Sequence, residues 1–256
     1  MKHWTHLIKT GKCIYKSHHN IYVYENSKYR WLLFNEHFIQ SLMNKKNPKK
    51  ILIPYLDVML IFPNLYPGKT CLLGLGGGSI VRHLIDKNFS VKVVEILPDM
   101  IEVAKHFFHL PSTEQLTIHC TCAQTFLIQT NEQFDHLIVD LGDYSGFPQN
   151  LKNKSFIELI FKAMKPGGYC TINLPQFYDI AWFKTLIQEV FSHLPVVIEA
   201  QGNWILLIQK QEKKQVLIDI LLQKNHLKHL TWHPYYGEIA VLHRPWVQKI
   251  KNYLFG

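Results

Sequence analysis

The residues most able to do chemistry are two aspartates that follow a buried β-like segment. Four of the six residues in Phe134–Val139 are apolar, and the segment runs directly into Asp140-Leu141-Gly142-Asp143. Ligands of open α/β sheets bind at the carboxyl ends of the strands, so acids at this place face the reactive end of a ligand. A carboxylate there can hold an ammonium group and then accept its proton. The alternative is structural, because two acids three residues apart also suit a turn that caps a helix.

A glycine-rich segment, Gly74-Leu75-Gly76-Gly77-Gly78-Ser79, is the second candidate. Glycine is needed where the backbone turns sharply and approaches a ligand closely. Glu95 follows about twenty residues later, at the expected tip of the next strand, where a carboxylate accepts the hydroxyls of a ribose. The alternative for Glu95 is an exposed acid at a strand end without a ligand. The loop and the carboxylate together predict a site for a nucleoside-containing ligand.

Three details favour an S-adenosyl ligand over a dinucleotide. Val81 stands where the third glycine of G-x-G-x-x-G would pack a helix against a strand. Cys122 and Ala123 follow the third strand, where methyltransferase-like folds place groups that read adenine. The turn Lys165-Pro166-Gly167-Gly168 before the fifth strand is also typical of that fold. The expected binding residues are Gly74, Gly76, Gly77, Gly78, Ser79, Glu95, Ile96, Cys122 and Ala123.

The surrounding sequence alternates strand-like and helix-like segments. This alternation predicts an α/β fold with a doubly wound, mostly parallel sheet covered on both faces. The expected strands are Thr70–Leu75, Ser90–Val94, Leu116–Cys120, Phe134–Val139, Tyr169–Asn173 and Trp204–Gln209. The expected helices are Ile80–Lys87, Pro98–Phe108, Ala123–Gln129, Ser155–Met164 and Ile180–Leu194.

The two ends of the chain have different patterns. Short β-like runs between polar turns predict a small antiparallel meander over residues 1–48. The runs are Cys13–Tyr15, Ile21–Glu25, Tyr29–Phe34 and Phe38–Leu42. A ligand-binding domain over residues 49–210 should follow, opened by a helix at Lys49–Leu65. For residues 211–256 we expect an extension with a helix at Glu212–Gln223 and a loop-rich aromatic tail.

The composition is that of a globular protein, because 47% of the 256 residues are hydrophobic and 13% are aromatic. A formal charge of +9 attracts anions, but an excess of this size more often forms a solvated coat, so we expect no nucleic-acid partner. The apolar run Ile51–Phe62 is too short to span a bilayer, and Met1–Cys13 lacks an apolar signal core. We therefore expect a cytoplasmic protein without a membrane partner. His226, His229 and His233 have a metal-like spacing, but no cysteine or acid completes a fourfold site, so we expect no metal site.

These features resemble the spermidine/spermine synthase family, the aminopropyltransferases, of which the chain looks like a divergent member. The resemblance covers most of residues 12–210. It rests on Tyr24-Glu25-Asn26, Gln40, Gly74–Gly78, Glu95, Asp140, Asp143, Phe156 and Pro166-Gly167-Gly168. It implies a small N-terminal β domain, a methyltransferase-like domain and a homodimer.

The activity that the resemblance implies is transfer of an aminopropyl group from decarboxylated S-adenosylmethionine to a polyamine or another amine. Asp140 would be the base, and Asp143, Gln40 and Tyr144 would bind the amine. The donor is a co-substrate, so no permanently bound cofactor is expected.

The chain departs from the family pattern at several polar positions. Ser79 stands where the family loop carries an acid, and Cys122 where an aspartate reads the adenine. Leu52 and Ile53 replace a Tyr-His pair that holds the donor and the polyamine. Three functions therefore stay open: an aminopropyltransferase with an altered acceptor, a methyltransferase that uses ordinary S-adenosylmethionine, and a non-catalytic ligand-binding descendant.

Overall fold

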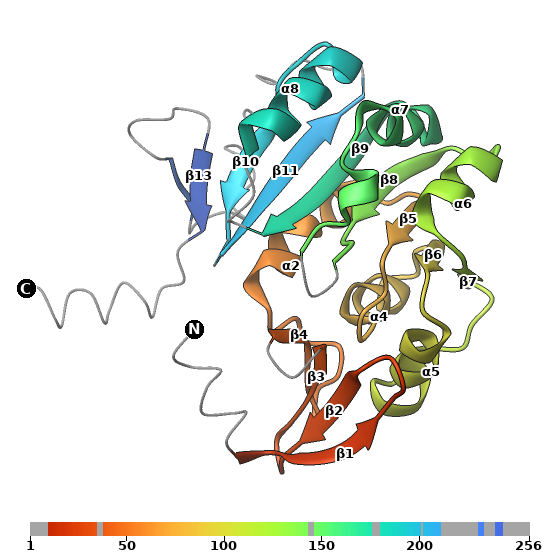
Figure 1. Ribbon diagram of the computed structural model, residues 1–256, viewed down its shortest axis with the longest axis vertical. Coiled ribbons are helices and arrows are strands. Elements are labelled where there is room, and N and C mark those ends of the chain that lie inside the picture. Colours follow the sequence, from red (N-terminus) through yellow and green to blue (C-terminus); the bar gives the residue numbers. More distant parts are fainter. Residues whose placement is uncertain are drawn as a thin grey trace, which may run out of the picture.

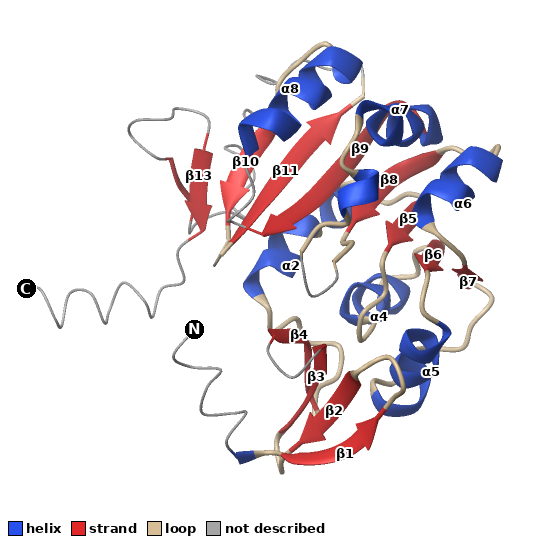
Figure 2. Ribbon diagram, viewed as in Figure 1, coloured by secondary structure: helices blue, strands red, loops and turns tan. Residues whose placement is uncertain are grey.

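Two β-sheets make up the framework of the protein (Figures 1 and 2). The computed structural model describes residues 10–34, 38–142, 146–175, 180–200, 202–210, 230–232 and 239–242. A four-stranded antiparallel sheet lies at the lower end of the view in Figure 1, beside a nine-stranded sheet flanked by helices. The predicted α/β architecture, with a small antiparallel sheet at the N-terminal side, is confirmed.

The small sheet is a simple meander with neighbours in chain order. Its strands are β1 (Lys12–Lys16), β2 (Ile21–Glu25), β3 (Tyr29–Phe34) and β4 (Phe38–Asn44). One face of this sheet buries Ile21, Val23 and Leu32 against Met100 and Phe108, in and just after the helix α5 (Pro98–Phe107). This packing attaches the meander to the helix that follows the second strand of the large sheet, close to the predicted ligand site.

The large sheet has the strand order β12-β13-β10-β11-β9-β8-β5-β6-β7. Strands β9, β8, β5, β6 and β7 run parallel to one another, while β11 is antiparallel to both of its neighbours. The strands are β5 (Thr70–Leu73), β6 (Val91–Glu95), β7 (Leu116–Cys120), β8 (Phe134–Val139), β9 (Met164–Pro175), β10 (Val196–Glu199), β11 (Asn203–Gln209), β12 (Leu230–Trp232) and β13 (Ile239–Leu242).

Helices bury the two faces of the large sheet in two separate cores. One core joins the sheet to α2 (Pro54–Met59), α3 (Ile61–Leu65), α4 (Ser79–Asp86) and α5. The other joins it to α6 (Ala123–Gln129), α7 (Lys154–Ala163) and α8 (Ile180–Phe191), which lie along one side in Figure 2. Cys71 and Leu72 in β5 point to opposite cores, as the alternation of side chains along a strand requires.

Three predictions of local structure need correction. The helix expected at Lys49–Leu65 is two short helices that start only at Pro54, because proline favours the first helical position, where no backbone N–H is needed. The expected Lys165–Gly168 turn belongs to β9, where the Gly167 N–H donates to the Lys210 carbonyl. The tail expected to be loop-rich contains β12 and β13, and β10 was also missed.

The helix predicted at Glu212–Gln223 and the histidines His226, His229 and His233 lie outside the described residues. Within the described ranges, no helix has the length and apolar character needed to cross a membrane.

Candidate functional site

Asp140 and the residues predicted to bind the donor lie at the carboxyl ends of adjacent parallel strands. The Gly74 N–H donates to the Val94 carbonyl at 2.8 Å, and the Asp140 N–H donates to the Leu73 carbonyl at 2.9 Å. On the far side, the Thr121 N–H donates to the Glu95 carbonyl at 3.0 Å. The glycine loop, Glu95, the Cys122 turn and Asp140 therefore form one continuous edge, as the sequence predicted.

Gly74 is the point where the loop touches the segment that carries Asp140. Its φ of +95° is a backbone conformation that residues with a side chain rarely adopt. An added Cβ would stand 2.3 Å from the Asp140 carbonyl oxygen. Glycine at this position thus serves two needs, a left-handed backbone and a close approach between two chain segments. The close contact fixes the loop against the residue predicted to be the base.

We expect Gly74→Ala to destabilise the protein more than the left-handed conformation alone would. That conformation costs about 1–2 kcal/mol for a residue with a Cβ, and the clash with Asp140 adds to it. Gly202→Ala is the matched control, because Gly202 has a φ of +93° and nothing within 4 Å of its added Cβ. Urea denaturation of both variants checks this. If both variants lose the same unfolding free energy, the clash with the Asp140 carbonyl adds nothing to the destabilisation.

Glu95 lies at the end of β6 with 8% of its surface exposed. Its Oε2 accepts the Leu75 N–H at 3.0 Å, and its Oε1 accepts the Leu97 N–H at 2.9 Å. Burial raises the pKa of this carboxyl, while these N–H donors act to lower it. The carboxylate therefore ties the glycine loop to the start of α5, and the next residue, Ile96, is 61% exposed beside it.

The third strand contributes a helix start to the same edge. Cys122 is half-buried and stands at the N-cap of α6, and Ala123 is buried in its first turn. The Cys122 side chain makes no capping hydrogen bond to the helix. These two residues lie where the sequence placed the adenine end of the ligand, although their contact with a ligand stays a prediction.

Asp140 is half-buried and is held through both of its carboxylate oxygens. Asn173 Nδ2, near the end of β9, donates to Oδ1 at 2.8 Å, and the Tyr55 hydroxyl, in the first turn of α2, donates to Oδ2 at 3.4 Å. Burial raises the pKa of Asp140, and the two hydrogen bonds act to lower it. Burial, followed by the charge of Asp140, raises the pKa of Tyr55 well above its usual range, so its hydroxyl stays a donor.

The raised pKa of Asp140 predicts that the stability difference between the wild type and Asp140→Asn depends on pH. A carboxyl whose pKa is higher folded than unfolded destabilises the fold once pH rises above its usual value of about 3.9. The unfolding free energy of the wild type should therefore fall relative to Asp140→Asn as pH rises from about 4.5 to 7.5.

Asp135→Asn is the control for this comparison. Burial acts to raise the pKa of Asp135, but the Lys165 ammonium and the Lys69 N–H outweigh it and lower the pKa. Asp135 is therefore ionised throughout the same interval, and its difference from the wild type should stay flat. Denaturant titrations at several pH values measure both differences. A flat difference for Asp140→Asn as well would contradict the raised pKa.

The sequence analysis missed Tyr55 and Asn173. Asn173 could have been found, since it is the last residue of the strand expected at Tyr169–Asn173, at the ligand-binding edge. Tyr55 carried no signal, because it lies in an apolar run that gave no indication of facing Asp140. It stands three residues after Leu52, which together with Ile53 occupies the positions of the family's Tyr-His pair.

Of the residues predicted to bind the amine, Asp143 and Tyr144 lie outside the described residues. Gln40 is half-buried and is the extra residue of a bulge in β4, between the pairs Leu32–Ser41 and Leu33–Ile39. Its role stays a prediction. Its neighbour Ser41 contacts the glycine loop, where Ser41 Oγ accepts the Gly77 N–H at 2.7 Å.

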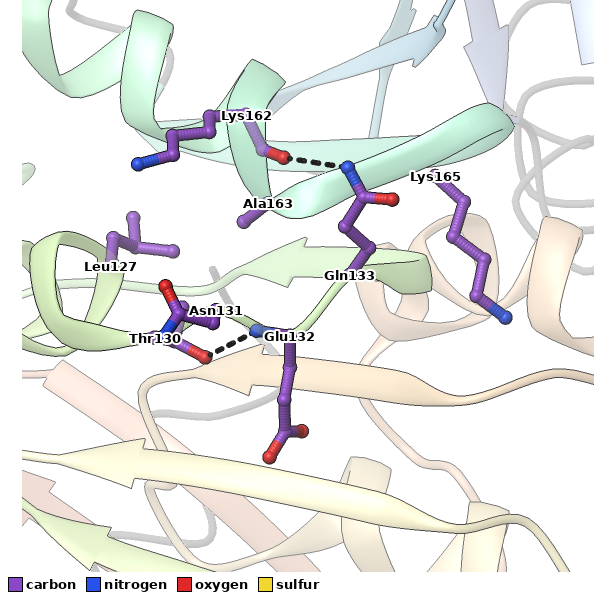
Figure 3. Close-up of a pocket in the computed structure, with 8 residues that line it drawn as sticks. All are labelled: Leu127, Thr130, Asn131, Glu132, Gln133, Lys162, Ala163 and Lys165. Carbon is purple, nitrogen blue, oxygen red and sulfur yellow. Dashed lines mark hydrogen bonds between the residues drawn. The ribbon is translucent and has the colours of Figure 1, made fainter.

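A separate pocket of about 340 Å³ lies at the opposite edge of the sheet (Figure 3). Its lining includes Thr130, Glu132 and Gln133, just before β8, and Lys162 and Lys165, at the junction of α7 and β9. Ligands of parallel sheets bind at the other ends of the strands, so we do not assign this pocket to the site. Among the described residues, no three His, Cys, Asp or Glu side chains gather into a metal-binding group.

Comparisons with known proteins agree with this geometry. The spermine/spermidine synthase domain matches residues 37–216. A spermidine synthase of Solanum lycopersicum is 27% identical over 210 residues, which cover 78% of this chain and 59% of that protein. The chain spans less than two thirds of the length of the first curated relatives that it matches.

Solved structures share the fold. A probable spermidine synthase of Corynebacterium glutamicum superposes with a TM-score of 0.69 at 19% identity, covering 90% of this chain and 89% of that one. Human methyltransferase-like protein 13 in complex with SAH gives a TM-score of 0.53 at 22% identity, over 71% of this chain and 92% of that one. The fold is therefore methyltransferase-like, and the chain belongs to the spermine/spermidine synthase family.

Proposed function

We propose that this protein is a spermidine synthase-like aminopropyltransferase, which moves an aminopropyl group from decarboxylated S-adenosylmethionine to an amine. The observation that carries the proposal is the setting of Asp140. Its carboxylate stands at the ligand-binding edge, and the partners described for it, Asn173 and Tyr55, are neutral donors. Its negative charge is thus left for a cation or a proton, and an alkylammonium group supplies both.

The reaction requires a neutral nitrogen, and this requirement gives Asp140 its role. A free alkylamine has a pKa near that of lysine, about 10.4, so at pH 7 deprotonation costs on the order of 4–5 kcal/mol. Asp140 holds the ammonium group and accepts one proton from it. The nitrogen lone pair then attacks the methylene carbon bonded to the sulfonium sulfur, the C–S bond breaks, and its electrons remain on a neutral thioether, methylthioadenosine.

The donor would occupy the edge from the glycine loop to the Cys122 turn. In this proposal Glu95 would accept the ribose hydroxyls, and Ile96, Cys122 and Ala123 would lie beside the adenine. The fold shared with a methyltransferase-like protein solved in complex with SAH supports an S-adenosyl ligand at this edge.

The hydrogen bonds that the glycine loop makes within the protein favour a donor without a carboxylate. The Leu75 N–H is already bonded to Glu95, and the Gly77 N–H to Ser41. The nearby cation, Arg82, is 5% exposed and donates to backbone carbonyls and to Ser79. Backbone N–H groups and a guanidinium are groups that can bind a carboxylate such as that of ordinary S-adenosylmethionine. Their internal use supports aminopropyl transfer over methyl transfer.

Calorimetry with three ligands tests the proposal. Decarboxylated S-adenosylmethionine, S-adenosylmethionine and methylthioadenosine are titrated separately into the full chain. Binding of the decarboxylated donor and of methylthioadenosine, each at least tenfold tighter than S-adenosylmethionine, is the expected result and justifies an amine screen. Preference for S-adenosylmethionine would replace the proposal with methyl transfer. Binding of the decarboxylated donor without turnover of any amine would indicate a ligand-binding descendant.

A further inference from the structure

Gly77 in the glycine loop is held through both of its backbone polar groups, the N–H and the carbonyl. Its N–H donates to Ser41 Oγ at 2.7 Å, and its carbonyl accepts a hydrogen bond from Arg82 Nη1. Ser41 belongs to β4 of the small sheet, whereas Arg82 belongs to α4, the helix that the loop opens. Gly77 also packs closely against Ser41, because a Cβ added to Gly77 would stand 2.8 Å from the Ser41 Cβ. The loop thus depends on an element outside the large sheet.

Arg82 donates hydrogen bonds to three further groups near Gly77. Its Nε donates to the Pro48 carbonyl at 3.0 Å, Nη1 also donates to the Phe108 carbonyl, and Nη2 donates to Ser79 Oγ at 3.1 Å. Pro48 follows the small sheet and Phe108 follows α5. The guanidinium fork therefore joins the end of the meander, the loop and the end of α5, with neutral oxygens as its described acceptors.

Unlike a surface ion pair, the buried Arg82 side chain fixes the orientation of the backbone carbonyls that it binds. Burial lowers the pKa of Arg82 to about 10, which leaves the side chain charged at neutral pH. A fixed, planar set of donors determines the orientation of each carbonyl that it binds. The Ser41 hydroxyl, itself 5% exposed, fills the remaining position by accepting from the Gly77 N–H. Both backbone hydrogen-bonding groups of Gly77, which belong to two consecutive peptide groups of the loop, are thus oriented before any ligand binds.

We infer that Ser41 and Arg82 are positioning residues that set the shape of the donor loop, so that the small N-terminal sheet forms part of the donor site. The inference rests on the proposed function for its effect on the donor, but the restraint on the loop stands without it. Neither side chain acts on the reacting atoms. They restrain the Gly74–Ser79 backbone through their hydrogen bonds to the Gly77 N–H and carbonyl.

Ser41→Ala tests the inference, and Ser17→Ala provides a matched control. Ser17 lies in the same meander, is 6% exposed, and its Oγ likewise accepts backbone N–H groups, from His19 at 3.1 Å and Ile21 at 3.3 Å. Both variants lose one buried hydroxyl acceptor, and Ser17→Ala also loses a hydrogen bond with Asp99, so both should lower the melting temperature. Only Ser41→Ala removes a contact with the glycine loop.

The first measurement is hydrogen exchange of the unliganded proteins, followed by mass spectrometry. Amides in residues 74–79 should exchange about tenfold faster in Ser41→Ala and unchanged in Ser17→Ala, whereas residues 17–21 should show the reverse. Equal exchange of the loop in the two variants would overturn the inference, whatever ligand the protein binds.

The second measurement is the Kd of decarboxylated S-adenosylmethionine, with the amine KM beside it. We expect a Kd about tenfold weaker for Ser41→Ala and for Arg82→Lys, which keeps the charge but lacks the fork, with the amine KM unchanged. Faster loop exchange without any change in Kd would overturn the role in donor binding. If the wild type binds no decarboxylated donor, the proposed function fails, and hydrogen exchange still decides whether the restraint exists.

Discussion

Asp140→Asn is expected to lower kcat for aminopropyl transfer by about 10²–10⁴-fold, the range that a positioned general base contributes. The asparagine side chain has a similar shape and can keep one of the contacts with Asn173 and Tyr55. It can neither accept the proton of the amine nor attract its positive charge. Steady-state kinetics at saturating donor measure the loss, and the donor Kd should change much less than kcat.

The matched control for this variant lies at the other end of the same strand. Asp135 accepts two hydrogen bonds from Lys165 Nζ, at 3.0 and 2.9 Å, and it stands at the edge opposite to Asp140. Asp135→Asn removes the same charge from β8 and should leave kcat within about twofold of the wild type. A similar fall in kcat for both variants would mean that Asp140 acts through the fold and not through the amine.

Glu95→Gln is expected to weaken binding of the donor and of methylthioadenosine by about 10–100-fold. The two carboxylate oxygens each accept a backbone N–H, from Leu75 and Leu97. A glutamine offers one oxygen and one NH₂ group, so one of these N–H donors loses its acceptor. In the proposed site the carboxylate also accepts the ribose hydroxyls. Loss of such a hydrogen bond to a charged group costs about 1.5–3 kcal/mol, and a tenfold change in affinity corresponds to about 1.4 kcal/mol.

Calorimetry of Glu95→Gln needs a control for the loss of one negative charge near α5. Glu102→Gln provides it, because Glu102 is an exposed residue of α5 that pairs with Lys105 at 2.9 Å. Its donor Kd should equal that of the wild type. An unchanged Kd for Glu95→Gln would show that Glu95 does not bind the ribose and that the ligand lies away from the end of β6.

The central part of the fold could be predicted because local patterns and tertiary structure agree there. Leu116–Cys120, Ala123–Gln129 and Phe134–Val139 match the observed elements residue for residue. Each apolar run is flanked by turn residues, and the parallel order follows from strands that alternate with helices. The glycine loop, Glu95 and Asp140 could be placed at one edge for the same reason, since the carboxyl ends of parallel strands meet there.

The remaining features depend on contacts between distant segments. β12 and β13 contain three and four residues, and β13 is a strand because it pairs with β10, about forty residues earlier. Tyr55 reaches Asp140 across 85 positions of the chain. Ser41 likewise meets Gly77 from a separate sheet. No local periodicity records such pairs, because periodicity reports which face of an element is buried and not which residue lies opposite to it.

The close approach of Gly74 to the Asp140 carbonyl has a consequence for how such an enzyme could change its substrate. The spacing between the donor loop and the base is set by main chain against main chain, with no side chain between them. Under the proposed function, replacement of side chains around the amine would change which acceptor fits and would preserve the separation of nucleophile and donor. Evolution could then change the acceptor without changing the geometry of the reaction, provided that position 74 stays glycine.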